Sequence, residues 1–158
     1  MKGQRVCSRC GSALTEQHGL RLAGVCGACL EMLLSSQGKE RADFIESIPS
    51  PAALVDRDLA ILSINSQFSR VFGSLTRYSI GPRIGEAVDC ANPTSDSRCG
   101  ETLHCFQCGI RRLVDVSRIT GESIGRIHVT FRHKSGVDQA YVFTTEKTPD
   151  AVLLVIGT

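Results

Sequence analysis

The positions of the cysteines constrain this chain more than any other feature of its sequence. Eight cysteines occur in 158 residues, in two groups of four that are separated by sixty residues without a cysteine. The first group is Cys7, Cys10, Cys26 and Cys29, and the second group is Cys90, Cys99, Cys105 and Cys108. An even number of cysteines also fits a set of disulfides in a secreted protein. No apolar signal segment precedes the first group, however, so the clustering predicts two sites of four thiolate ligands in a reducing compartment.

The first group has the pattern C-x2-C-x15-C-x2-C, which is typical of a closed structural zinc site. Each C-x2-C turn places two thiolates close together, and Gly11 and Gly27 offer backbone that tolerates tight or left-handed geometry. The segment resembles zinc-ribbon and rubredoxin-like knuckles. A rubredoxin-type iron ion or two disulfides would use the same four residues, but ligand type and compartment favour zinc. We therefore expect residues 1–29 to form a zinc knuckle with a structural or docking role.

Residues 30–48 have the spacing of a helical linker. The apolar side chains of this pattern are Leu30, Leu33, Leu34, Phe44, Ile45 and Ile48. Gly38 interrupts the pattern, so the linker is expected in two pieces, and two prolines at 49 and 51 end it. Positions 30, 34, 37, 41, 44 and 48 also alternate in steps of four and three, as in a coiled-coil seam, although Gln37 and Arg41 are polar. Two hypotheses follow, namely dimerisation through this linker or packing of the linker on its own domain.

Residues 49–158 have the pattern of one domain with strands at both ends. The predicted strands are, in order, 52–55, 60–64, 126–133, 140–145 and 151–156. Asn65 is predicted to cap a helix that ends at Gly73, and a second helix is predicted from 110 to about 121. Residues 74–109 between these helices are rich in loops and hold the second cysteine group. Two strands, helices and then three antiparallel strands predict an α+β fold.

The start of this domain resembles that of a PAS domain. Residues 44–56 offer a helix, a proline-containing lead-in and a strand that ends in Asp, and residues 61–73 continue with a second strand and an Asn that starts the next helix. The resemblance covers about residues 42–158. It implies a PAS-like five-stranded antiparallel sheet with helical connectors and a sensory role. An unrelated α+β domain with the same order of elements is the alternative.

The second cysteine group has steps of 9, 6 and 3 residues, and Gly100 follows its second member. It resembles a cysteine-rich subset of bacterial PAS sequences in which Cys-Gly precedes C-x2-C and an arginine-bearing helix, here with Arg111 and Arg112. Four soft ligands bind either zinc or an iron–sulfur cluster, and spacing does not choose between them. A helix that starts after Cys108 would direct its N–H groups toward the thiolates. The alternatives are a reversible disulfide pair and a structural staple without a sensing role.

The sequence predicts a regulatory protein rather than an enzyme. It contains no phosphate-binding loop, nucleophile elbow, H-E-x-x-H motif, kinase block or nucleotide-cyclase block. No apolar run approaches the length of a membrane span, so we expect a cytoplasmic protein. We expect it to act in bacterial signal transduction and to sense redox state, metal or a small ligand through the PAS-like domain and the second cysteine group. Its partner would be a signalling kinase or regulator, or a second copy of the chain.

Two other functions use the same features. The chain would be a structural interaction module if both cysteine groups held zinc and neither responded to a signal. It would be a zinc-ribbon regulator that binds nucleic acid if the cations near the knuckle met phosphates. These cations are Lys2, Arg5, Arg9 and Arg21. The formal net charge is only +2, from 18 basic and 16 acidic residues spread along the chain, which argues against nucleic acid.

Overall fold

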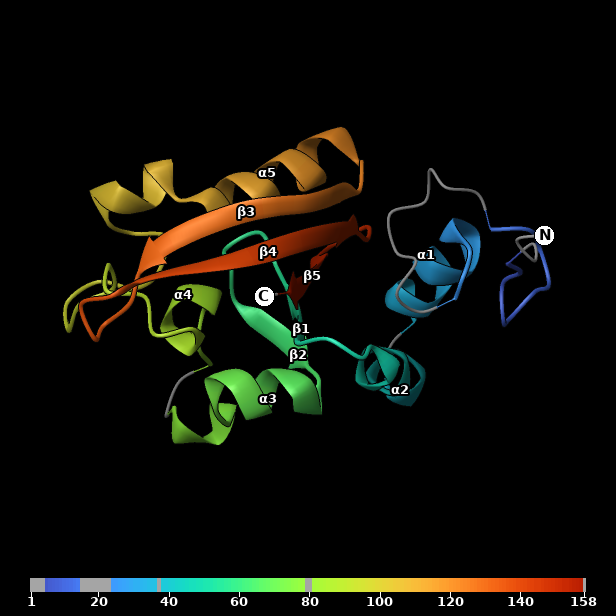
Figure 1. The fold of residues 1–158 in the computed structure, drawn as a ribbon, viewed down its shortest axis with the longest axis horizontal. Coiled ribbons are helices and arrows are strands. Elements are labelled where there is room, and N and C mark those ends of the chain that lie inside the picture. The colour runs from blue at the N-terminus through green and yellow to red at the C-terminus, as the bar shows by residue number, and fades with distance from the viewer. Residues whose placement is uncertain (1–4, 15–23, 37, 79–80, 158) are drawn as a thin grey trace.

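A five-stranded antiparallel sheet in the order β2-β1-β5-β4-β3 forms the centre of the protein (Figure 1). The computed structural model describes residues 5–14, 24–36, 38–78 and 81–157. The strands are β1 (Ala52–Val55), β2 (Ile61–Ile64), β3 (Ile124–Arg132), β4 (Asp138–Lys147) and β5 (Val152–Gly157). The expected fold class, an antiparallel five-stranded sheet with helical connectors, is confirmed. Within the described residues, no helix has both the length and the apolar character that crossing a bilayer requires.

The last strand of the chain occupies the middle of the sheet. β5 pairs antiparallel with β1, where Leu154 faces Ala53, and with β4, where Val155 faces Thr144. Alternate residues of a strand point to opposite faces of the sheet. Leu154 and Ile156 belong to one core cluster, whereas Val155 belongs to another. Both faces of β5 are therefore buried, which explains why this segment is apolar without alternation.

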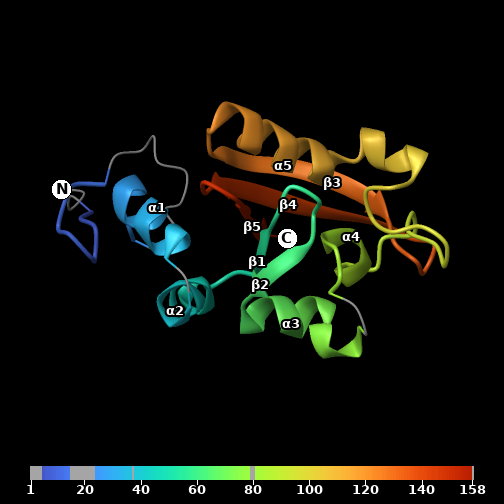
Figure 2. The same cartoon turned by 180° about the vertical axis from the view of Figure 1, so that it is seen from behind.

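In the described part of the connection between β2 and β3, the chain forms three helices and two short 3-10 helices, and all of these except the second 3-10 helix contribute to the first core cluster or pack against it. The helices are α3 (Ser66–Phe72), α4 (Ile84–Ala87) and α5 (Gly109–Thr120), and the 3-10 helices are η1 (Leu75–Arg77) and η2 (Leu103–Gln107). Helix α5 runs along β3 and β4 (Figures 1 and 2). Aromatic rings fill the space between α3 and the sheet, because Phe72 contacts Phe68 at 4.7 Å and Tyr141 at 5.5 Å between ring centroids. Tyr141 in turn stacks on Phe131 at 5.9 Å.

The linker forms two helices, α1 (Gly27–Ser35) and α2 (Lys39–Ser47), whose apolar side chains cover the opposite face of the sheet. Leu34 and Phe44 lie in one cluster with Leu54, Leu153 and other residues of β1 and β5. Of the six seam positions, 30, 34, 44 and 48 are buried in this cluster, and position 37 lies outside the described residues. The apolar stripe is therefore explained by packing of the linker on its own domain.

A buried asparagine joins α2, β1 and α3. The side chain of Asn65 is 1% exposed, and its Oδ1 accepts hydrogen bonds from the backbone N–H groups of Ala52 at 3.0 Å and Phe68 at 2.9 Å. Its Nδ2 donates to the carbonyl oxygens of Ile48 at 3.0 Å and Ser50 at 2.8 Å. The predicted N-cap of α3 therefore also fixes the direction in which the chain leaves α2.

Replacing this side chain tests that role. Asn65→Ala leaves two N–H groups and two carbonyl groups without this partner in buried surroundings, so we expect the free energy of unfolding to fall by about 3 kcal/mol or more. Urea unfolding of the full chain measures the change. Ser74→Ala is the matched control, because Ser74 caps η1 in an exposed position and its loss is expected to cost about 1 kcal/mol or less. Equal losses in the two variants would contradict the proposed importance of Asn65.

Candidate metal centres

The first pair of cysteines lies on a small hairpin. Val6 and Ala13 form an antiparallel bridge, and the N–H group of Cys7 donates to the carbonyl oxygen of Ser12 at 2.8 Å. The chain turns at Gly11, whose φ of +75° lies in the left-handed region that glycine tolerates best. The expected role of Gly11 is thus confirmed. Gly27, by contrast, is the first residue of α1 and has no positive φ, so of its two expected roles the left-handed one does not apply.

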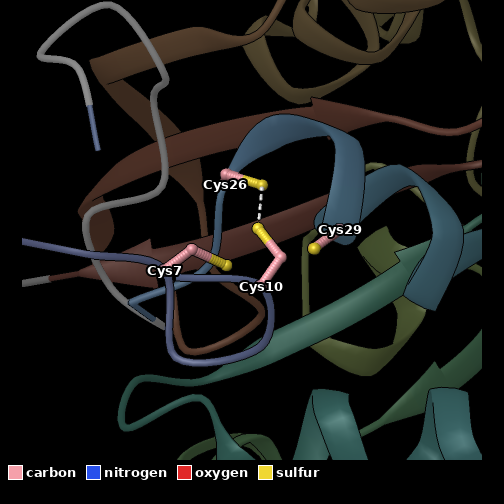
Figure 3. A group of neighbouring side chains, drawn as sticks. All are labelled: Cys7, Cys10, Cys26 and Cys29. Carbon is pink, nitrogen blue, oxygen red and sulfur yellow. Dashed lines mark hydrogen bonds between the residues drawn. The ribbon is translucent and has the colours of Figure 1, made fainter. Parts of the chain in front are cut away.

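The second pair of cysteines lies at the start of α1. Cys26 is the N-cap residue of this helix and Cys29 lies in its first turn. The Sγ atoms of all four cysteines lie within 4.8 Å of one another, and those of Cys10 and Cys26 are 3.6 Å apart (Figure 3). A zinc ion with Zn–S bonds of about 2.3 Å places the sulfurs of a tetrahedron about 3.8 Å apart. The four thiols of the first group therefore fit one metal ion, although most of the spacer, residues 15–23, lies outside the described residues.

The surroundings of these thiols favour a closed site. Hydrogen bonds from the backbone N–H groups of Cys26 and Cys10 lower the pKa of Cys7 to about 6. Burial, together with the neighbouring thiols, raises the pKa of Cys29 to about 12. A bound divalent cation would hold the buried thiol in its charged form. Four sulfur ligands leave no open position for a substrate, so a metal ion here would have a structural role.

The second cysteine group lies at the other end of the sheet. Cys90 follows α4, Cys99 lies in the next loop, Cys105 lies in η2, and Cys108 is the N-cap residue of α5. Cys108 is half-buried and the other three are buried. All eight cysteines fall within the described residues and are free thiols, so neither disulfide hypothesis describes this structure. The predicted start of a helix directly after Cys108 is confirmed.

These four thiols are neighbours, but they are less closely grouped than the thiols of the knuckle. Burial, together with the neighbouring thiols of Cys105 and Cys108, raises the pKa of Cys90 and raises that of Cys99 to about 12. Among the described residues, however, the knuckle cysteines are the only His, Cys, Asp or Glu group of three or more with ligand atoms within 4.8 Å. The assignment of Cys90, Cys99, Cys105 and Cys108 as ligands of one centre stays a prediction.

Donor groups surround the sulfur of Cys105. The backbone N–H group of Gly100 lies 3.2 Å from this Sγ, and the hydroxyl oxygen of Thr102 lies 3.1 Å from it. Burial raises the pKa of Cys105, but these hydrogen bonds and the charge of Arg111 outweigh burial and lower the pKa below its usual value. Arg111 also donates to the carbonyl oxygen of Gly100 at 2.8 Å. The site therefore favours a thiolate at Cys105.

Glu86 of α4 holds the loop around Cys99. One of its carboxylate oxygens accepts from the N–H group of Cys99 at 3.3 Å, and the other accepts from the N–H group of Arg83 at 2.9 Å. The guanidinium group of Arg98 donates to both oxygens at 3.2 Å. Burial raises the pKa of Glu86, but these hydrogen bonds outweigh burial and lower it overall. Glu86 is therefore a positioning residue for Cys99.

Close packing brings Cys99 onto α4. A Cβ atom at Gly85 would lie 2.6 Å from the Sγ atom of Cys99, so glycine is needed for this approach. The sequence analysis missed both Gly85 and Glu86. The usual signal for a helix start is Ser or Thr three residues before Glu, whereas Arg83 stands in that position here. The one element of this signal that the sequence does contain is Glu86, at the third position of α4.

Comparisons with known proteins bear on the fold. No family model matches the chain, and no curated protein matches it. Three solved structures with 14% sequence identity are similar to it. The photoactive yellow protein domain from the sensor histidine kinase Ppr of Rhodospirillum centenum has a TM-score of 0.50 and covers 81% of this chain and 99% of its own. The PAS domain of an HTR-like protein from Haloarcula marismortui has a TM-score of 0.44 and covers 73% and 91%.

The third structure is a domain of the sensory box sensor histidine kinase/response regulator from Geobacter sulfurreducens, with a TM-score of 0.45 and coverage of 73% of this chain and 89% of its own. At this level of identity the similarity shows the fold alone. The strand order and the similarity to the photoactive yellow protein domain show a PAS-like fold, as the sequence predicted, with a four-cysteine knuckle before it.

Removing one ligand tests the knuckle site. Cys10 is exposed, so Cys10→Ser removes a thiolate without creating a cavity in the core. We expect the purified full chain to lose one equivalent of zinc and its midpoint of thermal unfolding to fall by roughly 5–10 °C. Elemental analysis and a thermal scan measure the two effects. Ser8→Ala changes the same hairpin without touching a ligand, and an equal loss of zinc in this control would contradict the assignment.

Replacing Glu86 tests the clamp on the Cys99 loop. Glu86→Gln keeps the shape of the side chain but removes its charge, so its charged hydrogen bonds weaken and the free energy of unfolding is expected to fall by about 2 kcal/mol. The side chain of Glu101 is 46% exposed, against 17% for Glu86, and it pairs with Arg83 at 3.0 Å. Glu101→Gln is therefore the control, with an expected loss below about 1 kcal/mol. Denaturant unfolding that ranks Glu101→Gln as the more damaging change would show that Glu86 is not the clamp.

Proposed function

We propose that this chain is a sensory protein whose input site is the second cysteine group and whose output acts through a partner protein. The observation that carries the proposal is the attachment of the Cys90 loop to the sheet. The N–H group of Ala91 donates to the carbonyl oxygen of Arg132 at 2.7 Å, and the N–H group of Lys134 donates to the carbonyl oxygen of Asp89 at 2.8 Å. A change at Cys90 therefore reaches the end of β3 through the backbone itself.

The end of β3 leads directly into the hairpin that joins it to β4. Cys90 and His133 form an isolated antiparallel bridge. The hairpin closes where the N–H group of His133 donates to the carbonyl oxygen of Val137 at 2.9 Å and where Arg132 pairs with Asp138 at 2.6 Å. Strand β4 then pairs with the central strand β5. This path supports the passage of a signal from the cysteine loop into the sheet.

The close packing of the interior favours the second cysteine group, and not an internal site for a small molecule, as the place where the signal is sensed. The rings of Phe68, Phe72, Tyr141 and Phe131 contact one another in sequence between α3 and the sheet. In the cysteine loop, by contrast, Cys108 is half-buried and its neighbour Phe106 is exposed. A metal ion, an oxidant or a thiol reagent would reach this loop without opening the aromatic core.

The proposed output is a partner protein. The photoactive yellow protein domain that resembles this chain is part of a sensor histidine kinase, and the sequence here contains no kinase or cyclase motif. The alternative of nucleic-acid binding has less support. Arg9 of the knuckle pairs with Glu40 at 2.9 Å, so its charge is engaged within the chain. Lys2 and Arg21 lie outside the described residues.

Hydrogen exchange of the full chain tests the proposed input site. We expect treatment of the anaerobically purified protein with a metal chelator or a mild thiol oxidant to raise amide exchange in the hairpin 133–137 by about fivefold or more, because the loop that anchors it is released. Mass spectrometry of hairpin peptides measures the rate. Cys108→Ser should abolish the response, whereas Cys10→Ser, which alters only the knuckle, should keep it. A response confined to the knuckle, or one that persists in Cys108→Ser, would contradict the proposal.

A further inference from the structure

Four segments of the chain bring the cysteines of the second group around one place. Cys90 follows α4, Cys99 belongs to a loop, Cys105 belongs to η2 and Cys108 precedes α5. A Cβ atom at Gly85 would lie 2.6 Å from the Sγ atom of Cys99 and 3.7 Å from the Cβ atom of Cys90. The N–H group of Gly100, the residue after Cys99, lies 3.2 Å from the Sγ atom of Cys105, and the N–H group of Cys108 donates to the carbonyl oxygen of Cys105 at 3.2 Å. Cys90 and Cys99 belong to the first core cluster, and Cys108 packs against it. Four thiols contributed by separate segments at the edge of this core have the ligand composition of a metal centre.

The spacing of the sulfurs distinguishes this centre from the knuckle. In the knuckle all four Sγ atoms lie within 4.8 Å of one another, as one tetrahedral ion requires, whereas no three of the second group do so among the described residues. An iron–sulfur cluster of the four-iron type binds each cysteine through a different iron atom, so its four thiolates lie farther apart than those around a single ion. The wider arrangement fits the larger occupant.

Cationic and N–H groups surround the second group. The guanidinium group of Arg83 donates to the carbonyl oxygen of Cys99 at 2.7 Å, and that of Arg111 donates to the carbonyl oxygen of Gly100 at 2.8 Å. The N–H group of Gly100 donates to the Sγ atom of Cys105 at 3.2 Å. Cys108 is the N-cap residue of the twelve-residue helix α5, and the partial positive charge of the first turn favours an anion there. An assembly of four thiolates and a metal core carries net negative charge, which the N–H groups of Gly100 and α5 favour. The two guanidinium groups also pair with Glu101 at 3.0 Å and with Asp115 at 3.6 Å, so they contribute mainly by fixing the loop.

From the spacing and the charges we infer that Cys90, Cys99, Cys105 and Cys108 hold an iron–sulfur cluster, an assignment that rests on the proposed function because it names the occupant of the same input site. Glu86 holds the Cys99 loop in place, and Gly85 provides the room that the sulfur of Cys99 needs against α4. Binding of the cluster joins η2, the Cys99 loop and α5, and its loss releases the loop that anchors the β3–β4 hairpin.

Acid-labile sulfide is the decisive measurement, because neither zinc nor a single iron ion in the knuckle supplies it. The full chain is purified without oxygen and incubated with equal amounts of ferrous and ferric iron and with inorganic sulfide, which together supply the mixed-valence core without a further oxidant. We expect about four iron atoms and about four sulfides per chain, with a broad visible absorption. Cys105→Ser and Cys108→Ser should each lower the bound sulfide at least about fivefold, whereas Cys10→Ser should keep it.

Cys108 is half-buried, so Cys108→Ser stays informative if Cys105→Ser fails to fold, and circular dichroism checks both variants. A colourless chain with zinc and no sulfide overturns the inference, as does iron without sulfide. Bound sulfide that survives in Cys108→Ser and is lost in Cys10→Ser overturns it too. Failure here is distinct from failure of the proposed function, because a zinc-filled second site whose chelation still alters exchange in the hairpin would leave the sensory role in place.

Discussion

The central strand of the sheet is apolar on both faces, and the rest of the structure depends on covering both of them. Leu154 and Ile156 of β5 face the core that α3, α4 and α5 complete, whereas Leu153 and Val155 face the core that α1 and α2 complete. An uncovered face would leave a row of large apolar side chains in water, at a cost of about 25 cal/mol per Å². The linker and the knuckle are therefore part of the domain's packing, because they supply the second cover.

The layer that α1, α2 and the knuckle place over this face contains few large apolar side chains in its knuckle part. This shortage explains why cysteines are needed there. The described residues of the knuckle offer few large apolar side chains to the cluster, and Cys7 and Cys29 are buried there beside Val25 and Leu30. A small unit with little apolar mass needs a metal or a disulfide to hold its shape. Four thiols placed for one ion would fix the start of α1, and α1 in turn holds Leu33 and Leu34 in the core over the sheet.

The sequence predicted the elements that have a local signal, which is an apolar run, an alternation of apolar residues or a helix cap. It missed the elements that are held by contacts between residues distant in the sequence. The apolar run at 151–156, the alternation in β3 and the cap at Asn65 are local signals, and each marks an element that the structure contains. By contrast, α4 is four residues long and is held by Glu86, whose partners at Arg98 and Cys99 are more than ten residues away. Spacing identified eight cysteines but did not show that only the first four would lie as close as a single ion requires.

The two cysteine groups differ in what a change at each would do to the sheet. They lie at opposite ends of the molecule, with the knuckle beside α1 and the second group near the turn between β3 and β4 (Figures 1 and 2). The knuckle joins the sheet through side-chain packing, which depends on fixed shape, so loss of its metal would lower stability. The second group also packs on the sheet through Cys90 and Cys99, but its loop is attached in addition by backbone hydrogen bonds at a hairpin, where Ala91 and Lys134 are the contacts. A hairpin opens at much smaller cost than a core, which is the physical reason for proposing the second group, and not the knuckle, as the input site.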